Sequence, residues 1–284
     1  MANERTVLIT GATGKQGGAT ARALAGKGFE LRAMTRHPDS DAAKAVASAA
    51  GAEIVQGDLD DAASLKKVLK DVWGVFAVQN TWEAGVQGEE EQGKRLASLA
   101  REAGVQQYVY TSVGSAHRKT GIPHFDNKYR IEDTIRAAGF PSYVIFRPVF
   151  FMENLTSPWF LNGDTIHAAM RPNLKLQMIC VDDIGKYAAR GFTNADKLNH
   201  REIDLAADEV TMPDVALALS KGLGRNISYV EIPVSEVRKN SEDFAAMLEW
   251  FERVGYDVDI PSLEREFGIQ GTKLVDWAAK QKGS

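Results

Sequence analysis

The sequence predicts an α/β fold: a doubly wound, parallel-sheet Rossmann fold with a smaller C-terminal α+β region for a substrate or partner. Short apolar runs alternate with helical patterns over the first 150 residues, which is typical of β-α-β units and a parallel sheet. A glycine-rich segment, residues 10–18, separates the first apolar run from the first helical pattern. Right-handed crossovers place helices on both faces of such a sheet, with ligands at the carboxyl ends of the strands.

Each element of the first half follows from its local pattern. Strands are expected where apolar and β-branched residues run together, and helices where apolar residues recur at helical spacing. The expected strands cover residues 6–10, 30–34, 53–55, 72–78, 108–112 and 142–146. The expected helices cover residues 16–24, 41–50, 61–69, 89–103 and 126–138.

The second half has a looser pattern. A hairpin is expected over 165–178, turning at 171–173, and a helix opens at 182. Thr211 and Asp214 have capping-box spacing before a helix that stops near 222–224, and residues 227–232 predict a strand. One apolar helical face is expected in the core: Phe244, Met247, Leu248, Phe251 and Val254. We expect a Rossmann domain over 1–154 and a smaller region over 155–284 that is partly interleaved with the sheet.

Composition excludes several classes of function. Of 284 residues, 44% are hydrophobic and 25% charged, so the chain is not disordered throughout. The net charge of −4, without a dense basic block, gives no basis for direct nucleic-acid binding. The single cysteine, Cys180, suits a reducing compartment and is expected to be buried. With no leader pattern, no membrane helix and no metal-ligand spacing, we expect a cytoplasmic protein without a metal; the oligomeric state is left open.

The segment 10–18 carries the strongest functional pattern, G-x-x-G-x-x-G. Gly11 permits a tight turn after the strand, Gly14 a close approach to a pyrophosphate, and Gly17 close packing of the helix. The intervening residues of this cofactor-binding loop are Thr13, Lys15 and Gln16. The amides of the helix N-terminus favour phosphate groups. Dinucleotide binding is the prediction, and a purely structural glycine turn is the alternative.

The end of the second strand indicates which dinucleotide binds. NAD sites usually carry Asp or Glu there, but residues 31–38 contain no carboxylate. Arg36, 19 residues after Gly17 and followed by His37, can bind a 2′-phosphate through two hydrogen bonds, and Lys15 adds a second cation. This predicts NADP(H). The alternative is that Arg36 only covers a solvated strand end.

Polar residues also follow the third and fourth strands. Asp58, backed by Leu59, suits the adenine amino group, but it equally suits a helix N-terminal turn. Gln79, Asn80 and Thr81 suit ribose and nicotinamide contacts, with an ordinary polar loop as the alternative.

Several motifs together resemble the NmrA-like family of atypical short-chain dehydrogenases. They are GATGKQGG, TRHP, GDLDD, VFAVQNTWE, YVYTSVGS, HFDNK and FRPVFFMENL, followed later by VDDIG and LVDWA. The parent superfamily uses Ser with Tyr-x-x-x-Lys. By this resemblance Ser112 and Lys128 match the serine and lysine, whereas His124 stands at the tyrosine position. Tyr129 cannot replace that tyrosine, because an adjacent helical residue points about 100° away.

The resemblance implies two functions between which the residues do not decide. One is an NADP(H)-binding redox sensor or regulatory protein with little or no dehydrogenase activity, acting on a protein partner. The other is an NADPH-dependent oxidoreductase that passes hydride to a quinone, enone or carbonyl, with Lys128, His124 or water supplying the proton. The resemblance also implies that Pro148 and the segment 150–154, with Phe151 and Asn154, wall the nicotinamide side. The aromatic residues Trp82, Phe150, Phe151, Trp159 and Phe160 suit either a flat apolar substrate or a covered cofactor or partner surface.

Overall fold

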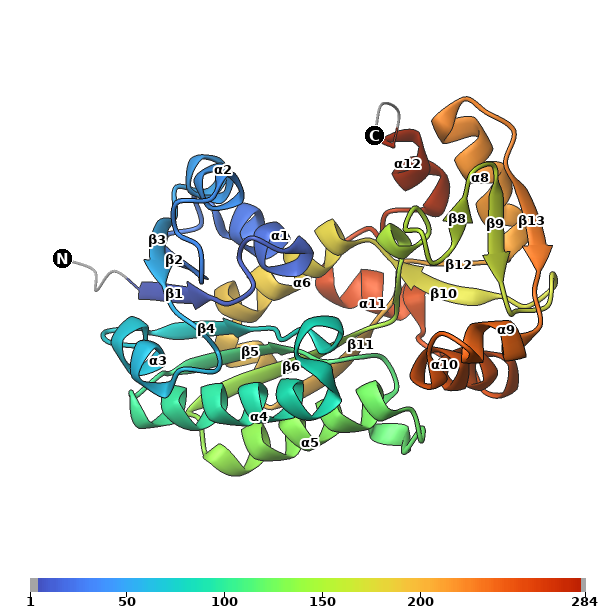
Figure 1. Ribbon diagram of the computed structural model, residues 1–284. Coiled ribbons are helices and arrows are strands. Elements are labelled where there is room, and N and C mark those ends of the chain that lie inside the picture. The colour runs from blue at the N-terminus through green and yellow to red at the C-terminus, as the bar shows by residue number, and fades with distance from the viewer. Residues whose placement is uncertain (1–4, 282–284) are drawn as a thin grey trace.

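The computed structural model describes residues 5–281 of the chain (Figure 1). The expectations about the first four residues and the last three residues of the polar tail lie outside the described part. A seven-stranded parallel sheet carries the first half of the chain, and two three-stranded sheets lie beyond it, so the predicted α/β Rossmann fold is confirmed.

The large sheet has the strand order β11-β6-β5-β4-β1-β2-β3, and every neighbouring pair is parallel. The order reverses between β1 and β4, which is where an open α/β sheet binds its ligand. Its strands are β1 (Arg5–Ile9), β2 (Phe29–Thr35), β3 (Glu53–Gln56), β4 (Gly74–Ala77), β5 (Gln107–Thr111), β6 (Ser142–Pro148) and β11 (Arg201–Leu205).

Helices cover both faces of this sheet (Figure 1). Along β1, Val7 and Ile9 join the core beneath α1 and α6, whereas Leu8 joins the core beneath α3, α4 and α5, as alternation along a strand requires. The bounds are α1 (Lys15–Leu24), α2 (Asp41–Ala50), α3 (Ala62–Val68), α4 (Thr81–Glu102), α5 (Pro123–Ala138), α6 (Val181–Thr193) and α7 (Ala195–Leu198).

Most of the remaining elements form a smaller region at the carboxyl end of the sheet (Figure 1), but α11 (Ile260–Phe267) packs Leu263 and Phe267 into the core beneath α1 and α6. Its two sheets have the orders β12-β10-β7 and β13-β9-β8. The strands are β7 (Phe150–Phe151), β8 (Leu161–Asn162), β9 (Thr165–Ala168), β10 (Leu176–Ile179), β12 (Asp208–Val210) and β13 (Ser228–Glu231). The helices are α8 (Met212–Leu223), α9 (Val234–Arg238), α10 (Glu242–Arg253), α11 (Ile260–Phe267) and α12 (Leu274–Ala279), with 3-10 turns at Ala116–Arg118 and Met152–Asn154.

Two local predictions are wrong. The expected hairpin over 165–178 does not form, because β9 pairs with β8 and β13 while β10 pairs with β7 and β12. The helix expected from residue 89 begins at Thr81, because Asn80 caps it and a kink at Gly85 (φ 75°, ψ 169°) absorbs the break. The kink leaves the first turn of α4, Thr81–Ala84, set off from the rest of the helix.

Other predictions of the second half are confirmed. Thr211 and Asp214 form a capping box at α8. Met247, Leu248 and Phe251 of the predicted apolar face are buried and Phe244 is half-buried, whereas Val254 is exposed just past the end of α10. Cys180 is buried, and burial raises the pKa of its thiol to about 11, so it is a poor nucleophile.

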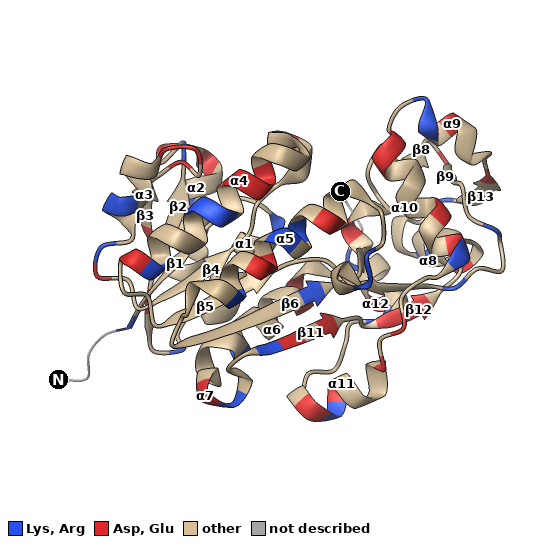
Figure 2. Cartoon of the chain, turned by 90° about the horizontal axis from the view of Figure 1, so that it is seen from below, with Lys and Arg blue, Asp and Glu red and all other residues tan. Residues whose placement is uncertain are grey.

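The surface of the described chain agrees with the weak net charge. Figure 2 shows basic and acidic residues interspersed along the helices and strands. Within residues 5–281, no helix has the length and apolar character needed to cross a bilayer.

Candidate active site: the carboxyl edge of the sheet

The glycine-rich segment forms a turn from β1 into α1. The Thr10 hydroxyl fastens the turn to β4, accepting from the Val78 amide at 2.9 Å and donating to the Val78 carbonyl at 3.0 Å. Gly11 has φ +57°, the left-handed region that favours glycine. A Cβ at Gly17 would lie 2.2 Å from the Gly11 carbonyl oxygen, so only glycine lets the helix start this close to the turn. The steric roles predicted for Gly11 and Gly17 hold.

The first turn of α1 is open to an anion. Its N-cap, Gly14, is exposed and has no side-chain cap, and no acidic residue stands in the first turn. Thr13 and Lys15 are also exposed, whereas the Gln16 side chain accepts from the Thr111 hydroxyl at 2.7 Å and fixes the loop to β5. Free amides and a helix dipole at this edge suit a pyrophosphate.

Arg36 follows β2 at the same edge of the sheet, with His37 exposed beside it. The Arg36 guanidinium pairs with Glu83, in the first turn of α4, and this hydrogen bond raises the pKa of Arg36. Half of each side chain, 51%, is exposed. Sequence reasoning missed Glu83, which lies 47 positions further along the chain.

Two polar side chains at the carboxyl ends of β4 and β5 lack partners within residues 5–281. Both amide atoms of Gln79 and the Ser112 hydroxyl are buried without a hydrogen bond there. Buried polar groups are nearly always satisfied. Gln79 is one of the residues predicted to contact ribose and nicotinamide, and Ser112 is the residue that matches the superfamily's serine. Hydroxyl and carboxamide groups are of the kind that would satisfy these atoms.

Other predicted polar residues are engaged inside the protein. Asp58 accepts from the Asp60 amide at 3.0 Å, as a turn residue does, and Leu59 is half-buried against the core beneath α3. Asn80 caps α4, accepting from the Trp82 amide at 3.1 Å. The Thr81 hydroxyl donates to Glu89. These bonds show a structural role for Asp58, Asn80 and Thr81.

Lys128 is held by a buried carboxylate. Its ammonium pairs with Glu89, which is fully buried and also accepts from Thr81 and, at 2.9 Å, from the Asn127 amide. Burial alone would raise the pKa of Glu89, but the Lys128 charge and these hydrogen bonds lower it overall. Lys128 keeps 14% of its side chain exposed. The network therefore fixes the position of the Lys128 side chain near the start of α5.

The His124 imidazole also has a partner inside the protein. Its Nδ1 contacts the Asp243 carboxylate of α10, and the ring is buried. The ring centroid of Trp82 lies 5.4 Å from His124 and 6.4 Å from Phe244. His124 thus lies at the contact between α5 and the smaller region. Asp243, 119 positions away, was not foreseen from the sequence.

The residues predicted to wall the nicotinamide side occupy the end of β6 and the turn after it. Pro148 is buried, while Phe151 and Asn154 are half-buried. Between them Glu153 accepts from the Val181 amide at 3.0 Å and the Trp277 indole at 3.1 Å, which ties this turn to α6 and α12. Burial raises the pKa of Glu153, partly offset by these hydrogen bonds and the charge of Lys15.

The predicted aromatic residues divide into two groups. Phe150 and Phe160 are buried in the core of the smaller region, so neither lines an open surface. Trp82 and Trp159 are 62% and 57% exposed and both contact Phe244. The exposed pair makes an apolar rim beside His124.

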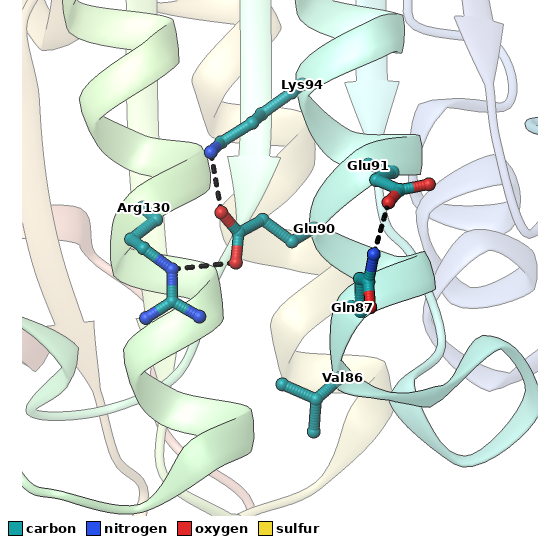
Figure 3. Close-up of a pocket in the computed structure, with 6 residues that line it drawn as sticks. All are labelled: Val86, Gln87, Glu90, Glu91, Lys94 and Arg130. Atoms are coloured by element: carbon teal, nitrogen blue, oxygen red, sulfur yellow. Dashed lines mark hydrogen bonds and ion pairs between the residues drawn. The ribbon is translucent and has the colours of Figure 1, made fainter.

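A surface pocket lies between α4 and α5 (Figure 3). The Glu90 carboxylate in its wall accepts from Lys94 at 2.5 Å and from Arg130 at 2.7 Å. None of the predicted site residues belongs to its lining, which is Val86, Gln87, Glu90, Glu91, Lys94 and Arg130. Its charges are largely paired with each other, so it adds nothing to the cofactor edge.

Comparison with known proteins finds relatives in sequence and in structure. The nitrogen metabolite repression protein nmr of Neurospora crassa is 27% identical over 292 residues, covering 88% of this chain; the chain spans 59% of that protein's length. NmrA, a negative transcriptional regulator solved with NADP, has a TM-score of 0.71 at 22% identity, covering 98% of this chain and 91% of its own. The NADPH-dependent quinone oxidoreductase QOR2 of Escherichia coli, solved with NADPH, has a TM-score of 0.77 at 22% identity, covering 96% and 99%.

At these identities the two structures show a shared fold. The family model gives more, since that of the NmrA-like family matches residues 3–282. The resemblance carried by the ordered motifs is confirmed, and this chain belongs to the NmrA-like family.

Proposed function

We propose that this chain binds NADP(H) at the carboxyl edge of its seven-stranded sheet and acts as a redox-sensing regulatory protein with little or no dehydrogenase activity. The combination of features at this edge carries the proposal. The edge keeps an open glycine turn, a cation at Arg36 and unpartnered polar atoms at Gln79 and Ser112, while His124 replaces the catalytic tyrosine and is bound to Asp243. These features support dinucleotide binding without the superfamily's tyrosine as proton donor.

We assign the predicted residues of the site to parts of the cofactor as follows. The amides of Lys15 and Gln16 in the first turn of α1 would face the pyrophosphate, since the Gly14 amide already donates to the Gly11 carbonyl at 2.9 Å. Arg36, His37 and Lys15 would supply the positive charge for a 2′-phosphate. On the adenine side lie Asp58 and Leu59. Gln79, Ser112 and Lys128 hold the ribose and carboxamide, with support from Asn80 and Thr81, and Pro148, Phe151 and Asn154 close the nicotinamide side.

We also propose a separate role for each region of the chain. Residues 1–154 would be the NADP(H)-binding unit, and residues 155–284 the region that meets a protein partner. Regulation requires that NADPH and NADP⁺ favour different surface states. A regulatory role is supported by two of the similar proteins, since one is a nitrogen metabolite repression protein and the other a negative transcriptional regulator. A cytoplasmic location is proposed from the single buried cysteine.

Titration calorimetry with NADPH, NADP⁺ and NADH tests the cofactor. We expect tight binding of both phosphorylated forms and weak binding of NADH. A difference between NADPH and NADP⁺ supports redox sensing. Binding of neither phosphorylated form contradicts the proposal.

Arg36→Ala is expected to weaken NADPH binding roughly 10- to 100-fold, because charged hydrogen bonds are worth about 1.5–3 kcal/mol. NADH binding should change little, since that cofactor has no 2′-phosphate. Arg225→Ala is the matched control, because Arg225 is another exposed arginine with an acidic partner, Asp164. Equal losses for NADPH and NADH in Arg36→Ala would contradict the role of Arg36.

A second function is favoured by the apolar rim of Trp82, Trp159 and Phe244 beside His124. This rim suits a flat quinone, enone or carbonyl acceptor, and the protein would then be an NADPH-dependent oxidoreductase. NADPH, when bound, would supply a hydride to the acceptor, and Lys128, His124 or water would supply the proton. The quinone oxidoreductase among the similar structures supports this second function.

Sustained, acceptor-dependent oxidation of NADPH distinguishes the two functions. If the chain is an oxidoreductase using Lys128, the double variant Lys128→Met/Glu89→Gln should lose turnover while it still folds. Unchanged turnover in that variant would remove Lys128 from the reaction. No turnover by the unaltered protein with quinones, enones or carbonyls supports the regulatory function.

A further inference from the structure

Arg36, the residue proposed to bind the 2′-phosphate, already has an anionic partner. The Glu83 carboxylate lies against its guanidinium, and both side chains are half exposed at the rim of the sheet. Carboxylates and phosphates bind a guanidinium through the same donor pair. A phosphate that reaches Arg36 must therefore share it with Glu83 or displace Glu83.

Glu83 lies in the first turn of α4, a short segment that is fixed at one end and kinked at the other. Thr81 anchors the segment through Glu89, and Gly85 ends it with a non-helical conformation that leaves open space around its Cα. Only three residues, Trp82, Glu83 and Ala84, lie between anchor and kink. Rotation about Gly85 can move this turn without disturbing the rest of α4.

The neighbour of Glu83 reaches the other side of the site. The Trp82 ring is tilted against His124 and meets Phe244 edge to face, the latter on α10 of the smaller region. His124 is in turn bound to Asp243 of the same helix. One turn of chain thus touches the phosphate-binding cation at one end and α10 at the other.

We propose that Glu83 is a specificity-determining residue that occupies Arg36 in place of the cofactor's 2′-phosphate, and that binding of a 2′-phosphorylated dinucleotide displaces Glu83 and moves Trp82. The inference rests on the proposed function, because it takes Arg36 as the phosphate ligand. The phosphate carries more charge than the carboxylate, and an exposed ion pair is weak, so the exchange favours the phosphate. A dinucleotide without the phosphate leaves the pair of Arg36 and Glu83 intact.

Calorimetric titration of Glu83→Gln with NADP⁺ and NAD⁺ tests the competition. We expect NADP⁺ to bind about two- to five-fold more tightly than to the unaltered protein, the range that an exposed ion pair allows. NAD⁺ binding should not change. In the Arg36→Ala background, Glu83→Gln should lose its effect. Glu91→Gln is the matched control, since it removes the same charge from the same helix at a position where the carboxylate accepts from Gln87.

The outcomes distinguish the competition from the proposed cofactor site. If the unaltered protein prefers NADP⁺ but Glu83→Gln binds it equally or more weakly, the competition is wrong and the proposed cofactor stands. A weaker complex would mean that Glu83 orients Arg36 for the phosphate. If the unaltered protein shows no preference for NADP⁺, the proposed cofactor site itself is contradicted, and the competition with it.

Tryptophan fluorescence tests the movement of the segment. The contribution of Trp82 is obtained by subtracting the emission spectrum of the Trp82→Phe variant from that of the unaltered protein. NADP⁺ should change this difference signal, whereas saturating NAD⁺ should not. The same change with both dinucleotides, or no change with NADP⁺, would overturn the coupling between the phosphate and Trp82.

Discussion

Gly17→Ala is expected to destabilise the fold by about 1–3 kcal/mol and to remove most of its dinucleotide binding. The added Cβ would lie 2.2 Å from the Gly11 carbonyl oxygen and 2.6 Å from that of Thr10. Both are backbone atoms, so relief requires that α1 move away from the turn. Urea denaturation measures the loss in free energy of unfolding, and calorimetry with NADPH measures the binding.

Gly18→Ala is the control for this substitution. Its Cβ would lie 3.3 Å from the Ala12 carbonyl oxygen and otherwise near the flexible end of Arg22. Alanine also has a helix propensity about 1 kcal/mol better than glycine. We expect the Gly18 variant to be close to the unaltered protein in stability, and comparable losses in both variants would contradict the steric argument.

Lys128→Met is expected to lower the free energy of unfolding by about 3–5 kcal/mol at neutral pH, although it keeps most of the lysine's apolar volume. The reason is Glu89, which is fully buried and would lose the cation that pairs with it. The hydrogen bonds from Thr81 and Asn127 remain, but they do not balance a buried charge.

The loss should depend on pH. In the unaltered protein the pKa of Glu89 lies below its ordinary value of 4.5, so its stabilisation is present above that pH and is lost as the pH falls through the lowered pKa. In the variant without Lys128, burial of the Glu89 carboxylate dominates and raises its pKa above 4.5. The variant therefore loses stability as the pH rises above 4.5. The deficit between the two proteins should therefore shrink towards about pH 4–5. Urea denaturation across this range measures it, and a deficit independent of pH would contradict the mechanism.

The double variant Lys128→Met/Glu89→Gln completes the test. Removing both charges should recover most of the lost stability, because neither partner is then left charged and buried. The same variant serves the turnover experiment, where a folded protein without the ammonium is needed. A double variant as unstable as Lys128→Met alone would show that the loss comes from packing.

The sequence predicts six of the seven strands of the large sheet because each of the six has a local pattern, whereas β11 (Arg201–Leu205), in the looser second half, is not predicted. The start of α4 is missed for a local reason too, since Gly85 and Gly88 indicate a break that the chain bridges with a kink. The hairpin over 165–178 fails for a different reason. Two strands that follow each other in sequence pair reliably only when no other strand competes. Here β13 pairs with β9, and β7 and β12 pair with β10.

In the site too, residues within one short segment could be predicted, but contacts between distant segments could not. The cofactor turn and Arg36 could be found because their chemistry lies within a short segment. Their acidic partners Glu83, Glu89 and Asp243 come from distant segments, and only tertiary packing brings them into contact. Glu89 does leave one signal, an acidic residue on the helix stripe that continues with the buried Gln92 and Leu96. An acid on such a stripe requires a buried partner.

The position of β11 has a consequence for the synthesis of the protein. β6 ends at Pro148, but its outer neighbour β11 is complete only at Leu205. At about 5–20 residues per second, the ribosome needs roughly 3–11 s to deliver that neighbour. During this interval the nascent chain presents an unpaired apolar edge that can pair with another chain. Chaperones should therefore matter most for this protein between the translation of these two strands.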